Sequence, residues 1–229
     1  MVAAISNSFQ VWRVNVNNRS LQREAIPGSW ERLGGRGLIA RLLLDAVPPD
    51  CEALGPRNKL IFCPGLLTGH MLSSIDRLSV GGKSPLTGGV KESNSGGTTS
   101  QLIAAMGIKA LIIEGWPLVS GMSVMHISLG GVRFDSAIDM VDLGVYETAE
   151  VLQKRYGKKV AIAIIGPAGE KKLASAGILN LDKDGIPSRI NARGGLGAVM
   201  GSKGLKAIVF DSSGSSKPPL VDAEAFRAT

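Results

Sequence analysis

Hydrophobic residues in this chain occur in short runs, which are typical of buried β-strands rather than of long helices. Residues 9–16 alternate between apolar and polar side chains, and the polar turn at 17–20 predicts a hairpin with 21–26. A second hairpin is predicted between 123–129 and 131–134, where glycines separate the two runs. Further apolar runs predict central strands at 59–63, 109–114, 159–165 and 205–210.

Helical spacing is confined to a few short segments. Helices are predicted at 37–46, 98–106 and 146–156. Pro48 and Pro49 end the first of these, and Ser29 is a candidate helix N-cap. Residues 170–175 predict a short helix or turn. Because strands outnumber helices, the pattern predicts an α+β fold with mixed β-sheets and short helices.

An internal repeat runs through the chain. KLIFCPGLLTG at 59–69 is followed by a glycine-rich stretch and then by IKALIIEG at 108–115. KVAIAIIGPAG at 159–169 is followed by a second glycine-rich stretch and then by LKAIVFDS at 205–212. The repeat predicts two similar halves related by a pseudo-twofold axis, with two glycine-rich loops facing one ligand.

The C-terminal part of the sequence changes character after the last predicted strand. The stretch DSSGSSKPP at 211–219 is polar and rich in serine and proline, as linkers are. We therefore expect an ordered domain over residues 1–211. Residues 212–229 are expected to form a linker and the start of a following domain that is missing from this sequence.

Composition adds an excess of glycine and a patterned positive charge. The chain has 30 glycines and a net charge of +7, and 14 of the glycines lie in the windows 34–37, 81–97 and 194–204. The stretches 77–91 and 185–209 contain bases but no acid, and they overlap the second and third windows. Exposed backbone N–H groups beside arginine side chains are what a phosphate or another compact anion requires. We therefore predict a bound anionic cofactor.

Other classes of protein fit the sequence less well. Nucleic-acid binding would explain the charge, but the bases alternate with glycine instead of aromatic residues and form no long basic run. Two cysteines and two histidines are too few for a zinc site or an iron–sulfur cluster within this chain. No apolar run approaches the roughly 20 residues that span a bilayer, and the N-terminus lacks a signal-peptide pattern. We therefore expect a cytoplasmic protein with no membrane or nucleic-acid partner.

Three sequence motifs, taken together, are more specific than the composition. They are GGRGLIARLLL at 34–44, KSPLTGGVKESNSGG at 83–97 and ARGGLGAVMGSKGLKAIV at 192–209. Their order and spacing resemble the N-terminal domain of the aldehyde ferredoxin oxidoreductase family of tungsten, or sometimes molybdenum, enzymes. The resemblance implies that residues 1–211 are a tungstopterin-binding domain. It implies a tungsten (or molybdenum) bis-pterin cofactor whose two phosphates are joined through magnesium.

The same resemblance implies that most of the enzyme lies outside this chain. The parent enzyme would oxidise aldehydes to carboxylic acids and pass electrons through a [4Fe–4S] cluster to ferredoxin, and that cluster is expected only in the missing domains. The fragment alone is expected to be inactive, and no residue here is expected to be a catalytic acid or base. The alternative is a stand-alone module that binds a pterin or another phosphorylated ligand. The oligomeric state stays open, with a homodimer as one option.

Matching the motifs residue by residue gives the expected cofactor site. By resemblance, Asn94 and Ala192 would bind magnesium through backbone carbonyls, and Arg77 would contact a pterin or its phosphate. Arg189 and Arg193 have the planar side chain that makes bidentate contacts to phosphate. The remaining expected neighbours of the cofactor are Ser95, Gly96, Gly97, Gly194 and Gly195.

Two points stay open at the level of sequence. Arg189, Lys83 and Lys203 lie in or beside the basic stretches, and the pattern does not decide for any of them between a phosphate contact and a solvated surface charge. Thr98, Thr99 and Ser100 stand where the family often has aromatic residues, which leaves the substrate class undecided.

Overall fold

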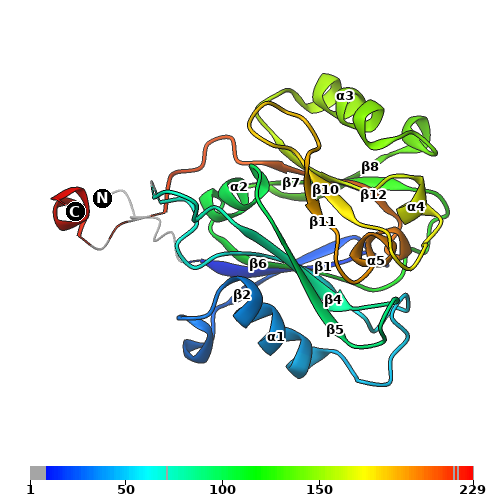
Figure 1. The fold of residues 1–229 in the computed structure, drawn as a ribbon, viewed down its shortest axis with the longest axis horizontal. Helices are drawn as coiled ribbons and strands as arrows, with labels where there is room; N and C mark the ends of the chain where they lie inside the picture. Colours follow the sequence, from blue (N-terminus) through cyan, green and yellow to red (C-terminus); the bar gives the residue numbers. More distant parts are fainter. Residues whose placement is uncertain (1–8, 71, 219, 221, 229) are drawn as a thin grey trace.

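The chain folds into two six-stranded β-sheets with helices between them and on their outer faces (Figure 1). The computed structural model describes residues 9–70, 72–218, 220 and 222–228. The first half comprises β1 (Gln10–Asn15), β2 (Ser20–Ala25), α1 (Gly35–Ala46), β3 (Leu60–Pro64), β4 (Leu78–Lys83), β5 (Val90–Ser95), α2 (Thr99–Ala105) and β6 (Ile108–Glu114). The second half comprises β7 (Ser123–Ser128), β8 (Gly131–Ser136), α3 (Val145–Tyr156), β9 (Ala161–Ile164), α4 (Pro167–Glu170), β10 (Ile178–Asn180), β11 (Arg189–Asn191), α5 (Leu196–Ser202) and β12 (Leu205–Asp211). Short 3₁₀ helices lie at Gly28–Trp30 and Ile138–Met140, and α6 (Ala223–Ala228) follows the second sheet.

The mixed α+β class predicted from the sequence is confirmed. Both predicted hairpins, the central strands and the main helices are present. Ser29 is not a helix N-cap, because the 3₁₀ helix begins at Gly28, with the extended Pro27 as its N-cap, and Ser29 lies inside it. The glycine-rich stretches that the repeat leaves as loops contain regular structure, namely β4, β5, β10, β11 and α5. Among the described residues, no helix is long and apolar enough to cross a membrane.

The two sheets have the same topology, which confirms the two similar halves. The strand order is β2-β1-β6-β3-β4-β5 in the first sheet and β8-β7-β12-β9-β10-β11 in the second. In each sheet the first strand of the half pairs in parallel with the last one, and all other neighbours are antiparallel. Even the irregularities agree, because the parallel pairing skips Lys109 in β6 and Lys206 in β12.

The main apolar core lies between the two sheets and contains side chains of both halves. The rings of Phe62 on β3 and Phe210 on β12 have their centroids 6.1 Å apart. Helices α2 and α5 enter this core through residues such as Ile103 and Val199, whereas α1 and α3 each cover the outer face of their own sheet. The halves also meet where β5 contacts β11.

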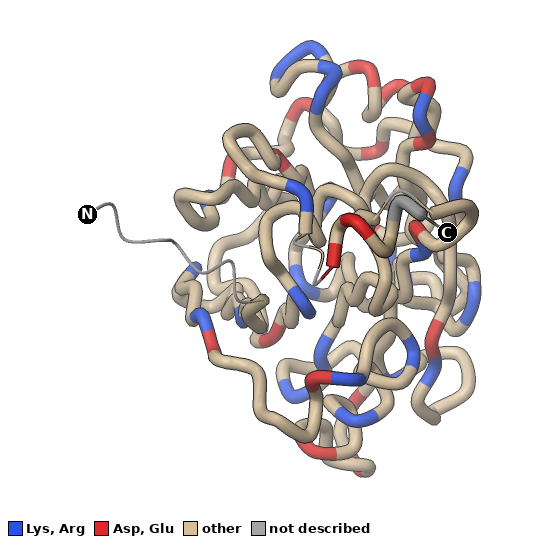
Figure 2. The backbone as a smooth tube through the Cα atoms, turned by 90° about the vertical axis from the view of Figure 1, so that its left-hand side faces the viewer, with Lys and Arg blue, Asp and Glu red and all other residues tan. Residues whose placement is uncertain are grey.

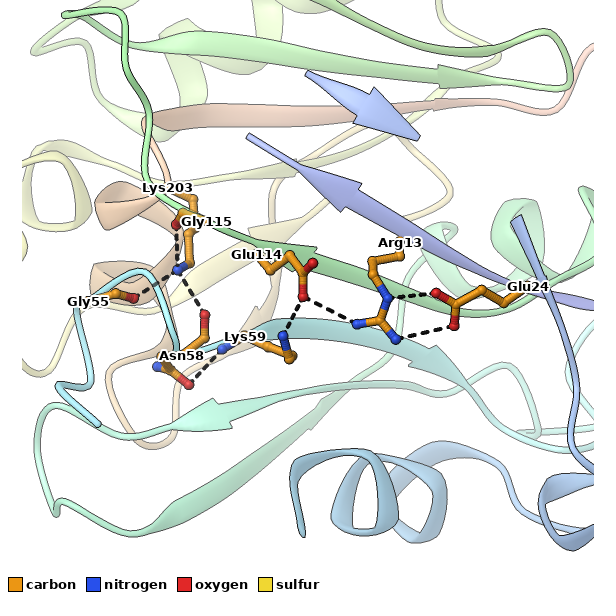
Figure 3. A network of polar contacts seen from close by, with 8 residues as sticks. All are labelled: Arg13, Glu24, Gly55, Asn58, Lys59, Glu114, Gly115 and Lys203. Carbon is orange, nitrogen blue, oxygen red and sulfur yellow. Dashed lines mark hydrogen bonds and ion pairs between the residues drawn. The ribbon is translucent and has the colours of Figure 1, made fainter. Parts of the chain in front are cut away.

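A buried lysine ties the second half to the first. Lys203 lies in the turn between α5 and β12 and is 1% exposed. Burial, together with the nearby charge of Lys59, lowers the pKa of Lys203 to about 8, so the amine still carries its proton at neutral pH. As Figure 3 shows, its Nζ donates hydrogen bonds to three backbone carbonyls of the first half, those of Asn58 (2.8 Å), Gly115 (2.9 Å) and Gly55 (3.0 Å).

Lys83 has a comparable role within the first half. Its amine donates to the backbone carbonyl of Pro49 and to that of Cys51, the latter at 2.6 Å. Each carbonyl accepts a bond from a charged donor, which is worth more than a bond from a neutral one. Both lysines that the sequence left open therefore hold backbone segments together, so neither is a solvated surface charge.

Candidate functional site

A groove of about 360 Å³ opens between the two halves, next to the end of β5 and the start of β11. The first half lines it with Ser74, Asp76, Arg77, Gly96, Gly97, Thr98 and Gln101, and the second half lines it with Asp182, Lys183 and Arg189. The structure thus brings Arg77, Gly96, Gly97 and Arg189 to one place, although Arg77 and Arg189 lie far apart in the sequence.

Arg77 is exposed at the start of β4 and is held in place by the neighbouring strand. Its Nε donates to Asn94 Oδ1 on β5 at 2.6 Å, and Asn94 Nδ2 donates to Ser79 Oγ at 3.3 Å. Ser79 in turn donates to Glu92 Oε1 at 2.5 Å. This chain of hydrogen bonds uses one edge of the guanidinium group and leaves its Nη groups facing the groove, close to Gly96.

The two glycines that follow β5 differ in their surroundings. A Cβ at Gly96 would lie 3.7 Å from Arg77 Nη1 and 3.9 Å from Arg189 Cδ, so Gly96 sits between the two arginines. Gly97 has a φ of +105°, and a Cβ there would lie 2.6 Å from the backbone oxygen of Leu181. The absence of side chains at both positions leaves the backbone accessible between two cations.

The acidic residues of the groove are occupied elsewhere. Asp76 accepts hydrogen bonds from the backbone N–H of Gly69 and from the side chain of Gln101. Asp182 accepts bonds from its own loop, and the hydroxyl of Ser188 is the main reason that the pKa of Asp182 lies below its usual value. Among the described residues, neither Arg77 nor Arg189 forms an ion pair with a carboxylate. The groove therefore offers unpaired guanidinium groups to an anion.

Basic and acidic residues are mixed along the backbone. Figure 2 views the molecule from the left-hand side of Figure 1, and along the tube Lys and Arg segments are interspersed with Asp and Glu segments.

The second expected loop, Ala192–Arg193, directly follows β11, at the opposite end of that strand from Arg189. Ala192 and Arg193 are exposed, and they are held against β5 by a hydrogen bond from the Arg193 N–H to Ser93 Oγ at 3.2 Å. The preceding residue, Asn191, donates from Nδ2 to the Ser93 carbonyl at 2.7 Å. The structure therefore places the Ala192–Arg193 loop beside the strand that carries Asn94.

Three of the expected cofactor neighbours are buried. Ser95 is 3% exposed, and its hydroxyl donates to Asn191 Oδ1. Gly194 packs against the side chain of Lys91, and a Cβ at Gly195 would lie 1.9 Å from the backbone oxygen of Ala174. Close packing alone therefore demands glycine at 195, in a left-handed backbone with φ of +71°.

A model of the aldehyde ferredoxin oxidoreductase N-terminal domain matches residues 11–212 of the chain. The chain belongs to this family. It is 37% identical over 219 residues to the tungsten-containing aldehyde ferredoxin oxidoreductase of Pyrococcus furiosus, covering 93% of this chain and 34% of that protein. It is 39% identical to the protein of the same description from Thermococcus kodakarensis, covering 89% of this chain and 32% of the relative. The resemblance inferred from the three motifs is confirmed.

The chain is also similar to proteins with other names. The WOR-like subunit of an aliphatic sulfonate oxidoreductase from Pyrococcus furiosus is 28% identical, over 85% of this chain and 32% of that protein. Among solved structures, the active-site complex BamBC of benzoyl coenzyme A reductase aligns with a TM-score of 0.81 at 33% identity, covering 88% of this chain and 30% of that one. The chain spans about a third of the length of each of these relatives.

Sequence reasoning did not find six residues that line the groove of this aldehyde ferredoxin oxidoreductase domain: Ser74, Asp76, Thr98, Gln101, Asp182 and Lys183. Asp182 and Lys183 open a DKDG turn, a pattern that predicts a tight turn but says nothing of what lies beside it. Only the meeting of β5 with β11 brings that turn to the groove.

Proposed function

We propose that this chain is the cofactor-binding N-terminal domain of a tungsten (or molybdenum) bis-pterin oxidoreductase, and that its groove holds the phosphate end of the cofactor. The observation that carries the proposal is the position of Gly96 between Arg77 and Arg189, one arginine from each half. A cofactor with two pterins has two phosphates, and the duplicated fold offers exposed arginines from both halves, Arg77 from the first and Arg189 and Arg193 from the second.

The roles proposed for individual residues follow from their chemistry. Arg77 and Arg189 would bind phosphate oxygens through their planar guanidinium groups, and the exposed Arg193 would bind the second phosphate. Magnesium prefers oxygen ligands, so the backbone carbonyls of Asn94 and Ala192 are suited to a magnesium ion between the phosphates. The bound cofactor would supply the two-electron redox chemistry, and the protein would orient and neutralise it.

We extend the proposal to the complete enzyme. It would oxidise an aldehyde and water to a carboxylic acid, releasing two protons and two electrons that pass through a [4Fe–4S] cluster in the other domains to ferredoxin in the cytoplasm. Relatives named as aldehyde oxidoreductases are 37% and 39% identical to this chain, against 28% for the sulfonate enzyme subunit, which favours the aldehyde as substrate. The 229-residue chain alone is expected not to reduce a viologen dye with aldehyde.

Arginine variants of the complete gene product test the site. Purified protein carrying Arg77→Ala and Arg189→Ala is expected to lose most of its pterin, measured as the fluorescent oxidation product released by acid. Arg41→Ala serves as the matched control, because Arg41 is an exposed arginine on α1 that pairs with Asp45. Equal pterin content in the double variant and the control would contradict the proposed site. A wild type that binds pterin without any metal or redox activity would instead favour the stand-alone binding module.

A further inference from the structure

Two equivalent residues of the duplicated fold touch each other beneath the groove. Ser95 ends β5 and pairs with Leu78, the first residue of β4. Asn191 ends β11 and pairs with Ile178, the first residue of β10. Ser95 and Asn191 therefore occupy the same place in their halves, and Ser95 Oγ donates to Asn191 Oδ1 at 3.0 Å.

Two more polar side chains complete this contact. Asn180 on β10 directs Nδ2 toward Asn191 Oδ1 at 2.8 Å and toward Ser95 Oγ at 3.3 Å. Ser93 accepts from Asn191 Nδ2 through its carbonyl and from the Arg193 N–H through its hydroxyl. We call Ser93, Ser95, Asn180 and Asn191 the amide cluster, and all of its members are at least 94% buried.

The position of the amide cluster matters more than its contribution to stability. Buried hydrogen bonds add little net free energy, but they are directional, and losing one partner leaves the other unsatisfied. The residue after Ser95 is Gly96, and the residue after Asn191 is Ala192, so each loop starts one residue beyond the cluster. The Ser95–Asn191 contact therefore joins the two strand ends from which the loops start.

We propose that Ser95, Asn180 and Asn191 are positioning residues that set the spacing between the Gly96–Gly97 loop and the Ala192–Arg193 loop. That spacing makes the site favour a ligand with two linked phosphates over a ligand with one. The inference rests on the proposed function, and it gives Ser95 a role beneath the site in place of direct contact with the cofactor.

Titration of the 229-residue chain with two probes tests the inference. Magnesium pyrophosphate has two linked phosphates, inorganic phosphate has one, and calorimetry gives the preference of the protein for the first. Ser95→Ala is expected to lower that preference roughly tenfold, equivalent to about 1.4 kcal/mol, while the affinity for inorganic phosphate stays unchanged. Asn180→Leu, which keeps the shape without the amide, is expected to behave in the same way.

Ser100→Ala is the matched control, because Ser100 is also a buried serine near the groove but its hydroxyl has no hydrogen-bond partner among the described residues. It should keep the wild-type preference. If Ser95→Ala folds and also keeps that preference, the cluster is only structural and the inference is overturned, while the proposed function stands. If the wild type binds neither probe, the proposed anion site fails, and the inference fails with it.

Discussion

Replacing Gly97 with alanine should destabilise the fold far more than the same change at Gly96, the other glycine that lines the groove. The φ of +105° at Gly97 is unfavourable for a residue with a Cβ, and the new atom would lie 2.6 Å from the backbone oxygen of Leu181. That oxygen already accepts a bond from the Thr98 N–H at 3.1 Å, which joins the first half to the second. Because Leu181 is 3% exposed and the obstacle is backbone, it cannot swing away as a flexible side chain would.

The expected loss of stability can be worked out from three terms. The positive φ costs about 1–2 kcal/mol, forcing a methyl group into filled space costs about 1–3 kcal/mol, and losing the hydrogen bond between Thr98 and Leu181 costs about 0.5–1.5 kcal/mol. Since these terms overlap, we expect Gly97→Ala to lower the free energy of unfolding by about 3–5 kcal/mol. For a domain of this size that corresponds to a fall in Tm of roughly 10 °C.

Urea and thermal unfolding, followed by circular dichroism, measure this loss against a matched control. Gly88 also has a positive φ, of +71°, but a Cβ there would have no heavy atom within 4 Å. Gly88→Ala therefore carries only the backbone term, about 1–2 kcal/mol, and a fall in Tm of roughly 4 °C. Equal losses in the two variants would refute the reasoning, because they would mean that the contact of Gly97 with Leu181 contributes nothing.

Three further predictions follow from single contacts. Gly96→Ala places a methyl group between two arginine side chains at ordinary contact distances. It should weaken the binding of pyrophosphate, measured by calorimetry, while Tm changes by only a few degrees. An unchanged affinity for pyrophosphate would contradict the groove as the anion site. Lys203→Met leaves three backbone carbonyls without their charged donor and should cost about 3–5 kcal/mol in urea unfolding. A loss below about 1 kcal/mol would mean that the amine does not hold the halves together. Burial, and then the charge of Arg133, lowers the pKa of His126 below its usual 6.5. As the pH falls, His126 is therefore protonated in the unfolded chain before it is protonated in the folded one, so the free energy of unfolding should decrease below about pH 6.5. His126→Gln should show a smaller fall between pH 7.5 and pH 5.5, and identical slopes would exclude His126 as the source.

The repeat could be predicted from the sequence because buried strands occupy matching places in both halves and carry similar apolar runs. The strand β4 could not be predicted, since its two glycines indicate a turn, and β5 could not be predicted because its sequence VKESNS has no apolar alternation. Gly81 and Gly82 are instead required by packing: a Cβ at Gly81 would lie 2.3 Å from Ile39 of α1, and one at Gly82 would lie 2.6 Å from the Lys59 carbonyl. Helix α5 was also not predicted, because its glycines indicate a loop although packing requires them. A Cβ at Gly201 would lie 2.0 Å from a backbone oxygen of α4.

The candidate site was predictable only in part. Arginine beside glycine marks both exposed loops in the sequence, and the motifs that resemble the family point to the same residues. That Arg77 and Arg189 approach one glycine depends on the contact between β5 and β11, which joins residues about a hundred positions apart. The burial of Lys203 could not be predicted either. A lysine that is buried and donates to three carbonyls cannot be told from a solvated surface lysine by its residue type.

The most direct test of the central claim is the metal content of the complete gene product, expressed without oxygen in cells supplied with tungstate and molybdate. Mass spectrometry of the purified protein should find close to one tungsten or molybdenum atom per chain, and Arg77→Ala with Arg189→Ala should lose most of it. The absence of both metals, under conditions that load a tungsten-containing aldehyde ferredoxin oxidoreductase expressed in parallel, would contradict the account.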